Sequence, residues 1–441
     1  MNQIVRSAIL GIWSLAALPA EDLVLNHFTL IDGTGKPPLS DAAMVVTDGR
    51  IAWVGPSVRL KAPAGAQNVD LSGKFIMPGI IDTHTHLAAS VDLVQDPKLY
   101  TRETVEQQLR QYASYGVTSV VSLGSDQDLI FALREEQRGT RPKMARIFTA
   151  GRGFSAVGGY PPAPAGTQKV QFEVGNPEDV RKDIAWLADR HVDLVKFWYD
   201  DHLGTDKKLS LDLAKDIIHD AHDKGLKVVA HIFYLQDAKD LANAGLNGLA
   251  HSVRDKPIDA ELISIMKSHN CIQMAATLTR ELSTFVFSQP DPMLDDPFLQ
   301  SGVSPKTLGT LKSSEYQMKV AAGMDAKHGR EWLSMAQKNL KALSDAGIKI
   351  GFGTDSGMPG RIQGYFEHVE LELMAGAGLT PIEVITDATK NTSEFLGVSK
   401  DLGTLEKAKW ADLLVLGKNP LDNIRNTRTI EAVYIAGNKV N

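Results

Sequence analysis

The residues of this chain that are best suited to chemistry are two histidines that follow an apolar run. His84 and His86 come after residues 78–81, with one residue between them. Because side chains alternate along a strand, both imidazoles are expected to point to the same side, where they could bind one cation. Asp82 is expected to orient them as a hydrogen-bond acceptor. An exposed strand end explains an isolated His-x-His equally well, so the rest of the chain decides between these interpretations.

Four further candidate ligands each lie at or near the end of a short apolar run, and these are Lys196, His231, His251 and Asp355. Each of them alone has a simpler explanation. A buried lysine usually extends towards water, a strand histidine usually forms hydrogen bonds in the core, and an aspartate before Ser-Gly is usually a turn residue. Their common position at strand ends favours a shared site.

Taken in order, the six residues resemble the metal ligands of the amidohydrolase superfamily, whose binuclear members use His-x-His, a carboxylated lysine, two further histidines and an aspartate. The resemblance extends from about Leu23 to Val440. It is strongest for imidazolonepropionase-like and prolidase-like members, because the chain combines Lys196 with Gly-Thr-Asp-Ser-Gly at 353–357.

The resemblance implies a cofactor of two zinc ions, although manganese or cobalt also suit nitrogen and oxygen ligands. It assigns one metal to His84, His86 and Asp355, the other to His231 and His251, and both to Lys196 as N6-carboxylysine. Lys196 can take this form because burial lowers the pKa of an amine, and the neutral amine adds carbon dioxide. The two ions would share a hydroxide that attacks a carbonyl. Asp355 would act as the catalytic general base and then as the acid.

This ligand set predicts a hydrolase that cleaves the amide bond of dipeptides, Xaa-Pro or similar, or of N-acyl amino acids. Two other enzyme classes stay open. An imidazolonepropionase-like cyclic amide hydrolase or deaminase generally uses one metal and lacks the lysine, whereas a lactonase would use the same hydroxide. A non-catalytic scaffold is disfavoured because no ligand is missing. The expected partners are a small molecule or dipeptide and, as is common in the superfamily, further copies of the chain in a homo-oligomer.

Residues in the loops that follow the strands are candidates for substrate binding. Tyr234, just after strand five, is a candidate catalytic donor to the oxyanion or to a substrate carboxylate, with a wall aromatic as the alternative. Arg152 and Arg280 could each bind a substrate carboxylate, with a surface ion pair as the alternative. Tyr160 lies in the loop 151–162, which is expected to approach the site after strand three.

Two segments are expected to cover the site. The loop 151–162 contains Gly-x-Gly-x-x-Ala, but Pro161 and Pro162 prevent the helix that a dinucleotide site requires, which favours an active-site loop. The long stretch 281–327, between strands seven and eight, is predicted to be a lid, with a surface insertion as the alternative.

Eight strand-like apolar runs alternate with amphipathic segments, which predicts a parallel sheet of βα units. The runs are 75–81, 118–123, 146–150, 192–197, 227–231, 245–250, 271–276 and 348–353. The amphipathic segments include 104–115, 177–190, 211–224 and 331–346. The predicted fold class is α/β, a (β/α)8 TIM barrel. All six candidate ligands fall at the carboxyl ends of its strands, where such barrels hold their chemistry.

Both ends of the chain carry β signals. The dipeptide Asp48-Gly49 predicts a hairpin near the N-terminus, and the apolar runs 412–416 and 433–435 give the C-terminus the same pattern. In the superfamily such ends combine into one small β-sandwich domain. The predicted domains are therefore a composite β-sandwich from 21–74 and 405–441, and a hydrolase barrel over 75–404.

Composition places the chain among ordinary globular proteins, with 43% apolar and 23% charged residues among 441. The net charge of −6 and the lack of basic windows with interleaved aromatics argue against nucleic-acid binding. Cys271 is the single cysteine, so no intrachain disulfide can form.

The first 20 residues have the pattern of a signal peptide. Arg6 precedes a short apolar stretch that ends in small residues up to Ala20. This pattern predicts export, so that the mature protein is periplasmic or secreted; an N-terminal helix packed on the fold is the alternative. No apolar run reaches the ~20 residues of a spanning helix, so no membrane anchor is expected after processing.

Overall fold

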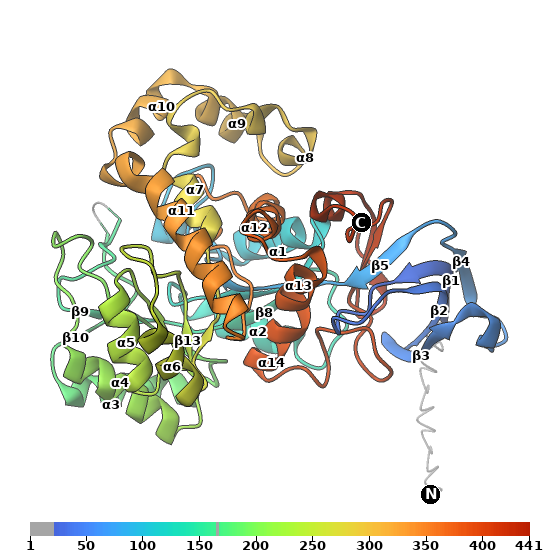
Figure 1. Ribbon diagram of the computed structural model, residues 1–441, viewed down its shortest axis with the longest axis horizontal. Coiled ribbons are helices and arrows are strands. Elements are labelled where there is room, and N and C mark those ends of the chain that lie inside the picture. The colour runs from blue at the N-terminus through green and yellow to red at the C-terminus, as the bar shows by residue number, and fades with distance from the viewer. Residues whose placement is uncertain (1–21, 165–166) are drawn as a thin grey trace, which may run out of the picture.

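The computed structural model describes residues 22–164 and 167–441 of the chain. The predicted signal peptide, residues 1–20, lies outside the described residues. Figure 1 shows a larger part, built of strands and helices, beside a smaller sheet near the C-terminus. None of the helices in the described part is both long enough and apolar enough to cross a membrane.

The smaller sheet contains strands from both ends of the chain. Its order is β17-β16-β15-β5-β1-β2-β3, and β4 pairs with β1. Strands β2 and β3 join through Asp48 and Gly49, whose φ angles of 50° and 79° fit a two-residue hairpin turn, as predicted. The bounds are β1 (Leu23–Leu30), β2 (Leu39–Thr47), β3 (Arg50–Pro56), β4 (Gln67–Asp70), β5 (Phe75–Pro78), β15 (Leu413–Leu416), β16 (Ile430–Ile435) and β17 (Asn438–Lys439).

All eight strands belong to one hydrogen-bonded sheet, in the domain for which the sequence predicted a small β-sandwich. The two chain ends meet where β5 pairs with β1 on one side and with β15 on the other. Side chains from both ends share one apolar core, in which Phe28 and Met44 lie with Leu413 and Tyr434. Burial of these side chains is what holds the sheet together as a unit.

The first predicted barrel strand, over 75–81, is divided between two sheets. Strand β5 ends at Pro78 in the smaller sheet, and β6 (Ile80–Thr85) begins the barrel strands. Gly79 separates them, and its N–H donates to the carbonyl oxygen of Asp412 at 2.9 Å. A Cβ on Gly79 would lie 2.1 Å from Oγ1 of Thr118, so only glycine allows this close approach.

Seven of the predicted barrel runs contain parallel strands. One sheet has the order β6-β7-β8, and another has β10-β9-β11-β12-β13-β14. The eighth run, 348–353, forms no continuous strand, but Ile350 bridges Gln273 and Phe352 accepts a hydrogen bond from Thr83. The fold is of the TIM-barrel type with an additional domain. The bounds are β7 (Val117–Ser122), β8 (Arg146–Thr149), β9 (Phe154–Ala156), β10 (Phe172–Val174), β11 (Val195–Trp198), β12 (Val228–His231), β13 (Gly248–Leu249) and β14 (Ile272–Gln273).

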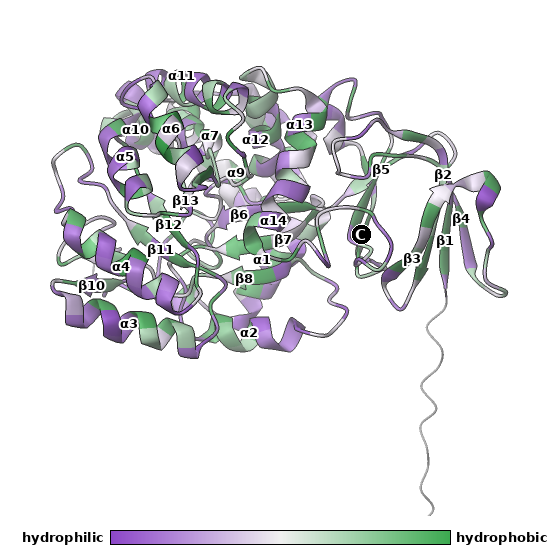
Figure 2. Cartoon of the chain, turned by 60° about the horizontal axis from the view of Figure 1, so that its bottom comes forward, coloured by the Kyte–Doolittle hydropathy of each residue, from purple (hydrophilic) through white to green (hydrophobic). Residues whose placement is uncertain are grey.

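Amphipathic helices follow the strands, and the four predicted segments are confirmed as α1, α3, α4 and α11. Helix α4 shows why they form: Ser210 caps its first turn, and Ala214, Ile217, Ile218 and Ala221 form a buried stripe. Figure 2 shows helix α3 with hydrophilic and hydrophobic residues in alternation, as expected for a helix with one exposed face. The bounds are α1 (Arg102–Ser114), α2 (Leu129–Gln137), α3 (Pro177–Asp189), α4 (Leu211–Asp223), α5 (Leu235–Asn243), α6 (Ala260–Ser268), α11 (Met324–Asp345), α12 (Tyr365–Gly376), α13 (Pro381–Thr386) and α14 (Thr392–Leu396).

The long stretch after strand seven is helical and lies at one end of the molecule, at the top of Figure 1. It has a core of its own, in which Phe287, Leu299 and Leu311 pack with Tyr365 and Phe366 of α12. Its elements are α7 (Leu278–Ser283), α8 (Pro297–Gln300), α9 (Pro305–Lys312) and α10 (Ser314–Ala321). We call residues 281–323 the helical insertion.

One carboxylate ties the helical insertion to the loop after β6. Oδ1 of Asp92 accepts hydrogen bonds from the hydroxyls of Ser304 and Thr307, each at 2.8 Å. Ser304 is the N-cap of α9, so Asp92 holds the start of that helix. These hydrogen bonds lower the pKa of Asp92.

Candidate metal centre and active site

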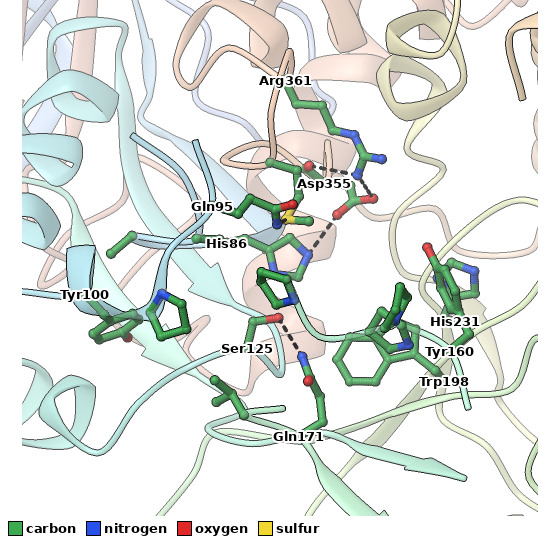
Figure 3. Close-up of a pocket in the computed structure, with 18 of the residues that line it drawn as sticks. His86, Gln95, Tyr100, Ser125, Tyr160, Gln171, Trp198, His231, Asp355 and Arg361 are labelled. Atoms are coloured by element: carbon green, nitrogen blue, oxygen red, sulfur yellow. Dashed lines mark hydrogen bonds and ion pairs between the residues drawn. The ribbon is translucent and has the colours of Figure 1, made fainter. Parts of the chain in front are cut away.

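Five of the six predicted ligands lie at one buried point. The ligand atoms of His84, His251 and Asp355 are within 4.8 Å of one another, so these three could hold a metal ion. Nε2 of His86 lies 2.8 Å from Oδ1 of Asp355 (Figure 3). The ring centroids of His231 and His251 are 4.1 Å apart. The strand ends predicted from the sequence therefore converge.

Position along the strands explains this convergence. His84 lies in β6, His231 is the last residue of β12, and His251 follows β13 by two residues. Asp355 follows the eighth run, and its N–H donates to the carbonyl oxygen of His84 at 2.6 Å. Parallel strands of a barrel end at the same face, so residues far apart in sequence meet there.

Hydrogen bonds fix the histidine rings. Nδ1 of His84 lies 3.0 Å from the carbonyl oxygen of Ala250, and Nδ1 of His251 lies 2.7 Å from Oγ1 of Thr277. Each contact leaves Nε2 of the same ring for a metal. Burial lowers the pKa of both imidazoles well below the usual value, because desolvation disfavours the charged ring. Neutral imidazole is the form that binds metal.

His231 is oriented by a residue that sequence reasoning missed, Asp200. Nε2 of His231 lies 2.9 Å from Oδ2 of Asp200, which leaves Nδ1 for a metal. Burial opposes ionisation of Asp200, but the hydrogen bond with His231 and the charge of Arg254 hold its pKa below the usual value. Burial lowers the pKa of His231 to about 3. An acid directly after the strand-four run was the signal that could have found Asp200.

Lys196 is the least conventional member of the site. Its side chain is 0% exposed, and its Nζ has no hydrogen-bond partner among the described residues. Desolvation lowers its pKa to about 7, so much of the amine is neutral near neutral pH. A buried amine without a partner is costly, and a carbamate that binds metal would give it one. Nδ1 of His86, also buried in the described structure without a partner, fits the same site.

Asp355 has a strained backbone and a two-sided carboxylate. Its φ is 62°, in the left-handed region that non-glycine residues rarely adopt and that often marks a functional site. Oδ1 faces His84 and His86, whereas Oδ2 contacts Nη1 of Arg361 and lies 3.6 Å from Nε of Arg280. Burial alone would raise the pKa of Asp355, but the charge of Arg361 and the hydrogen bond with His86 hold it well below the usual value.

Glu367 on α12 supports the two residues that flank Asp355. Its Oε1 accepts hydrogen bonds from Oγ of Ser356 at 2.6 Å and from Oγ1 of Thr354 at 3.2 Å. Oγ1 of Thr354 also donates to Asp82 at 2.6 Å. This buried network was not predicted, because Glu367 lies inside a helix and its role depends on how α12 packs against the loop after strand eight.

Asp82 braces the backbone, whereas the sequence predicted that it would orient the imidazoles. Its Oδ1 accepts a hydrogen bond from the backbone N–H of His84 at 2.7 Å, and Oδ2 faces Thr354. Alternation along β6 would put Asp82 on the same side as His84, but its carboxylate is taken up by the backbone N–H of His84 and the hydroxyl of Thr354. Burial, with the neighbouring Glu367 carboxyl, raises the pKa of Asp82 well above the usual value.

A pocket of about 870 Å³, part of it open to solvent, lies against this cluster. Tyr160 lines it, as predicted, and its ring centroid lies 5.3 Å from that of His231. Its walls are aromatic and proline side chains with a few neutral polar groups and Arg361, namely Tyr100, Trp198, Pro97, Pro161, Pro162, Pro164, Gln95, Gln127, Gln171 and Ser125 (Figure 3).

The structure places two other predicted substrate contacts elsewhere. Arg152 pairs with Asp128 at 2.8 Å and lies over the ring of Trp186, outside the pocket lining, so the prediction of a carboxylate clamp is corrected to a surface ion pair. Tyr234 begins α5 and donates its hydroxyl to Asp201 at 3.0 Å. Its ring is turned towards this acid, so the structure gives no support to a catalytic role for Tyr234.

Arg280 is buried beside the site but does not line the pocket. Its Nη1 lies 2.6 Å from Oε1 of Glu281, and Nε of Arg254 lies 3.1 Å from the same oxygen. Two guanidinium groups thus share one carboxylate. Arg361, six residues after Asp355, reaches the pocket instead, and its place in the loop after strand eight was the signal that could have found it.

Comparison with known proteins agrees with the geometry. The sequence profile of the amidohydrolase family matches residues 75–440. The chain belongs to the amidohydrolase family. An imidazolonepropionase from Deinococcus radiodurans is 24% identical over 408 residues, which cover 90% of this amidohydrolase and 92% of that protein. The structure of a proposed prolidase from Bifidobacterium longum superposes with a TM-score of 0.76 and 26% identity, covering 96% of this chain and 95% of that chain.

Other similarities are local. The imidazolonepropionase from Saccharopolyspora erythraea is 51% identical over 61 residues, which are 14% of this chain and only 15% of that protein. The family and the full-length similarities indicate a hydrolase that acts on carbon–nitrogen bonds. They place the chain in the subgroup that contains imidazolonepropionase-like and prolidase-like members.

Proposed function

We propose that this amidohydrolase cleaves the amide bond of dipeptides, Xaa-Pro or similar, or of N-acyl amino acids. The observation that carries the proposal is the buried, unpartnered amine of Lys196 at a cluster of four histidines and an aspartate. The full-length structural similarity to a proposed prolidase supports the substrate class.

The proposed cofactor is a pair of zinc ions, held by the predicted ligands with Lys196 as N6-carboxylysine. His84, His231 and His251 are neutral, and each has one ring nitrogen held by a protein oxygen, so the other nitrogen is available. When bound, the ions would supply an activated water and polarise the scissile carbonyl.

The protein's own residues then handle the proton and the substrate. Oδ1 of Asp355 would accept a proton from the attacking water and deliver it to the leaving nitrogen. Oδ2 stays with Arg361, so the carboxylate keeps one orientation. Tyr160 and Trp198 would exclude water and hold an apolar part of the substrate.

We also infer that the eight runs close into a barrel. Three backbone contacts support this inference where the sheets are not continuous. The N–H of Asp193 donates to Thr149 at 2.9 Å, that of Gly351 to Gln273 at 2.8 Å, and that of Thr83 to Phe352 at 2.9 Å. A closed barrel would hold the six ligands at a fixed spacing.

The second candidate function is hydrolysis of a cyclic amide of the imidazolonepropionate type. It is favoured by the full-length similarity to the Deinococcus radiodurans imidazolonepropionase. Such a reaction is expected with one metal per chain, so metal stoichiometry separates the two candidates. A lactone would be attacked by the same activated water.

The test is a mass-spectrometric screen of purified, zinc-loaded protein against dipeptides, N-acyl amino acids, cyclic amides and lactones. The Asp355→Asn variant is the blank, because it keeps the size of the side chain and loses the base. Cleavage of the first two classes by the wild type alone, with two metals per chain, supports the proposal. Cleavage of the cyclic amides alone, with one metal, would replace it by the second candidate.

We further propose that residues 1–20 direct export and are removed, and that the mature protein, periplasmic or secreted, self-associates. N-terminal sequencing of the native protein checks the first statement, and sedimentation checks the second.

A further inference from the structure

Arg361 has one guanidinium nitrogen to spare in the pocket wall. Nη1 contacts Oδ2 of Asp355, and Nε donates to Oγ of Ser283 at 3.3 Å. None of the residues that the structure describes forms a hydrogen bond or ion pair with Nη2. The contacts drawn from Arg361 in Figure 3 run to Asp355. The Arg361 side chain is 17% exposed and lines the pocket.

Arg361 is also the only arginine or lysine that lines this pocket within the described part of the chain. The two acids of the lining are already engaged, since Asp96 caps a backbone N–H at 2.9 Å and Asp355 contacts His86 and Arg361. The other polar lining groups are histidines, tyrosines, glutamines and a serine, none of which carries a permanent charge. An anionic group that enters the pocket therefore meets one permanent cation of the protein.

The nearby arginines cannot take this role. Arg280 and Arg254 share the carboxylate of Glu281 and lie outside the pocket lining. Arg152 is paired with Asp128. The free Nη2 of Arg361 can donate a charge-assisted hydrogen bond to a carboxylate, and such a bond is stronger than one to a neutral amide.

We propose that Arg361 is the specificity-determining residue that binds the free α-carboxylate of the substrate's leaving group. This inference rests on the proposed amide hydrolysis and names its recognition element. Arg361 touches Asp355, which would protonate the leaving nitrogen. In an α-amino acid only the Cα atom separates that nitrogen from the carboxylate carbon, so one substrate can contact both residues. A carboxylate on a longer side chain would move the amide away from Asp355.

The experiment compares matched substrates, each as the free acid and as the C-terminal amide. For the best dipeptide or N-acyl amino acid, kcat/KM is measured with wild type, Arg361→Gln and Arg361→Lys. Wild type should prefer the acid by about 10- to 100-fold, the range expected for one charge-assisted hydrogen-bonded contact. Arg361→Gln should bring the acid-to-amide ratio close to one, and Arg361→Lys should restore part of it.

The acid-to-amide ratio of kcat/KM distinguishes two roles of Arg361, which are recognition of the substrate carboxylate and support of Asp355. Any effect of Arg361 on Asp355 acts on acid and amide alike and cancels in the ratio. Arg152→Gln, which removes an arginine outside the pocket, is the matched control and should keep the wild-type ratio. An unchanged ratio in Arg361→Gln, at any absolute rate, would overturn the proposal. Metal content and melting temperature verify that each variant is folded.

A binding experiment distinguishes failure of this proposal from failure of the proposed function. If wild type cleaves neither dipeptides nor N-acyl amino acids, binding of N-acetyl-L-proline and its amide is measured by calorimetry on the zinc-loaded protein. Preference for the acid in wild type, lost in Arg361→Gln, supports the carboxylate site without the reaction. Equal binding of acid and amide by wild type would exclude it.

Discussion

The two halves of the site are built differently. In the metal half, the predicted ligands are buried on or next to barrel strands, and several are held by another residue, as His231 is by Asp200 and His251 is by Thr277. In the substrate half, the pocket walls come from loops and include exposed edges, such as the free nitrogen of Arg361. The barrel scaffold therefore fixes the residues that would perform the chemistry, whereas the loops determine substrate specificity.

Helix α12 serves both halves through two buried glutamates one turn apart. Glu367 accepts hydrogen bonds from the residues beside Asp355. Glu370 accepts them from the backbone N–H groups of Leu278 and Thr279, where α7 begins the segment after strand seven. One helix therefore ties the rigid half to the loop half, and substitutions in each half should differ in kind.

The largest expected effect is in the metal half, from Lys196→Ala. We expect metal content to fall below two ions per chain and kcat to fall by roughly 10³-fold, the scale for losing a principal electrostatic group. Metal analysis and steady-state kinetics measure both. Lys208→Ala, which removes a lysine that pairs with Asp237, serves as the control. Two retained metals with near-normal activity in Lys196→Ala would show that Lys196 is no ligand.

A smaller effect is expected from removing Glu367, which accepts hydrogen bonds from the two residues beside Asp355. Glu367→Ala should weaken metal binding by about 10- to 100-fold, because residues that orient ligands have effects of this size. Glu367→Gln keeps an acceptor for Ser356 and should lose less. Competition with a chromogenic chelator measures the affinity. If both variants bind metal like wild type, Asp355 keeps its position without Glu367.

Glu370 gives a pH-dependent test of the link to the loops. Burial raises its pKa to about 7, above the unfolded value. Between pH 4.5 and 7 the native state thus holds more protons than the unfolded state, so raising the pH reduces stability, by at most about 1.4 kcal/mol per pH unit. Urea unfolding of wild type and Glu370→Gln across this range checks the sign. The slope should be smaller in Glu370→Gln, and equal slopes would contradict the assignment.

The smallest effect is expected in the loop half, from Asp92→Ala. Loss of the acceptor for Ser304 and Thr307 should destabilise the start of α9 by about 1 kcal/mol, the scale of a helix cap. Limited proteolysis within the helical insertion should accelerate, whereas metal content should stay at the wild-type level. Asp295→Ala, which removes a partner of the exposed Lys312, should leave cleavage unchanged. Loss of metal in Asp92→Ala would mean that the two halves are coupled more tightly than we infer.

This division between strand ends and loops explains which features could be predicted from the sequence and which could not. The strand runs and the convergence of the predicted ligand residues could be predicted because a barrel puts the ends of its strands at one face. The division of the first run at Gly79 was missed because it depends on contact with Thr118, which no local pattern reports. The partners of Arg152 and Tyr234, which are Asp128 and Asp201, could not be predicted because local sequence does not fix the direction of a loop side chain. Glu367 was missed for a related reason, since its role arises from helix packing.

In the smaller sheet, strand β5 lies between β1, from the beginning of the chain, and β15, from its end, and it pairs with both. During synthesis its second edge has no partner until residues 413–416 have left the ribosome. An unpaired apolar edge is a template for association with other chains. Because the chain is made from its N-terminus, the smaller sheet can be completed only at the end of synthesis. Chains that stop before β15 should therefore aggregate, even though they contain all six predicted ligand residues.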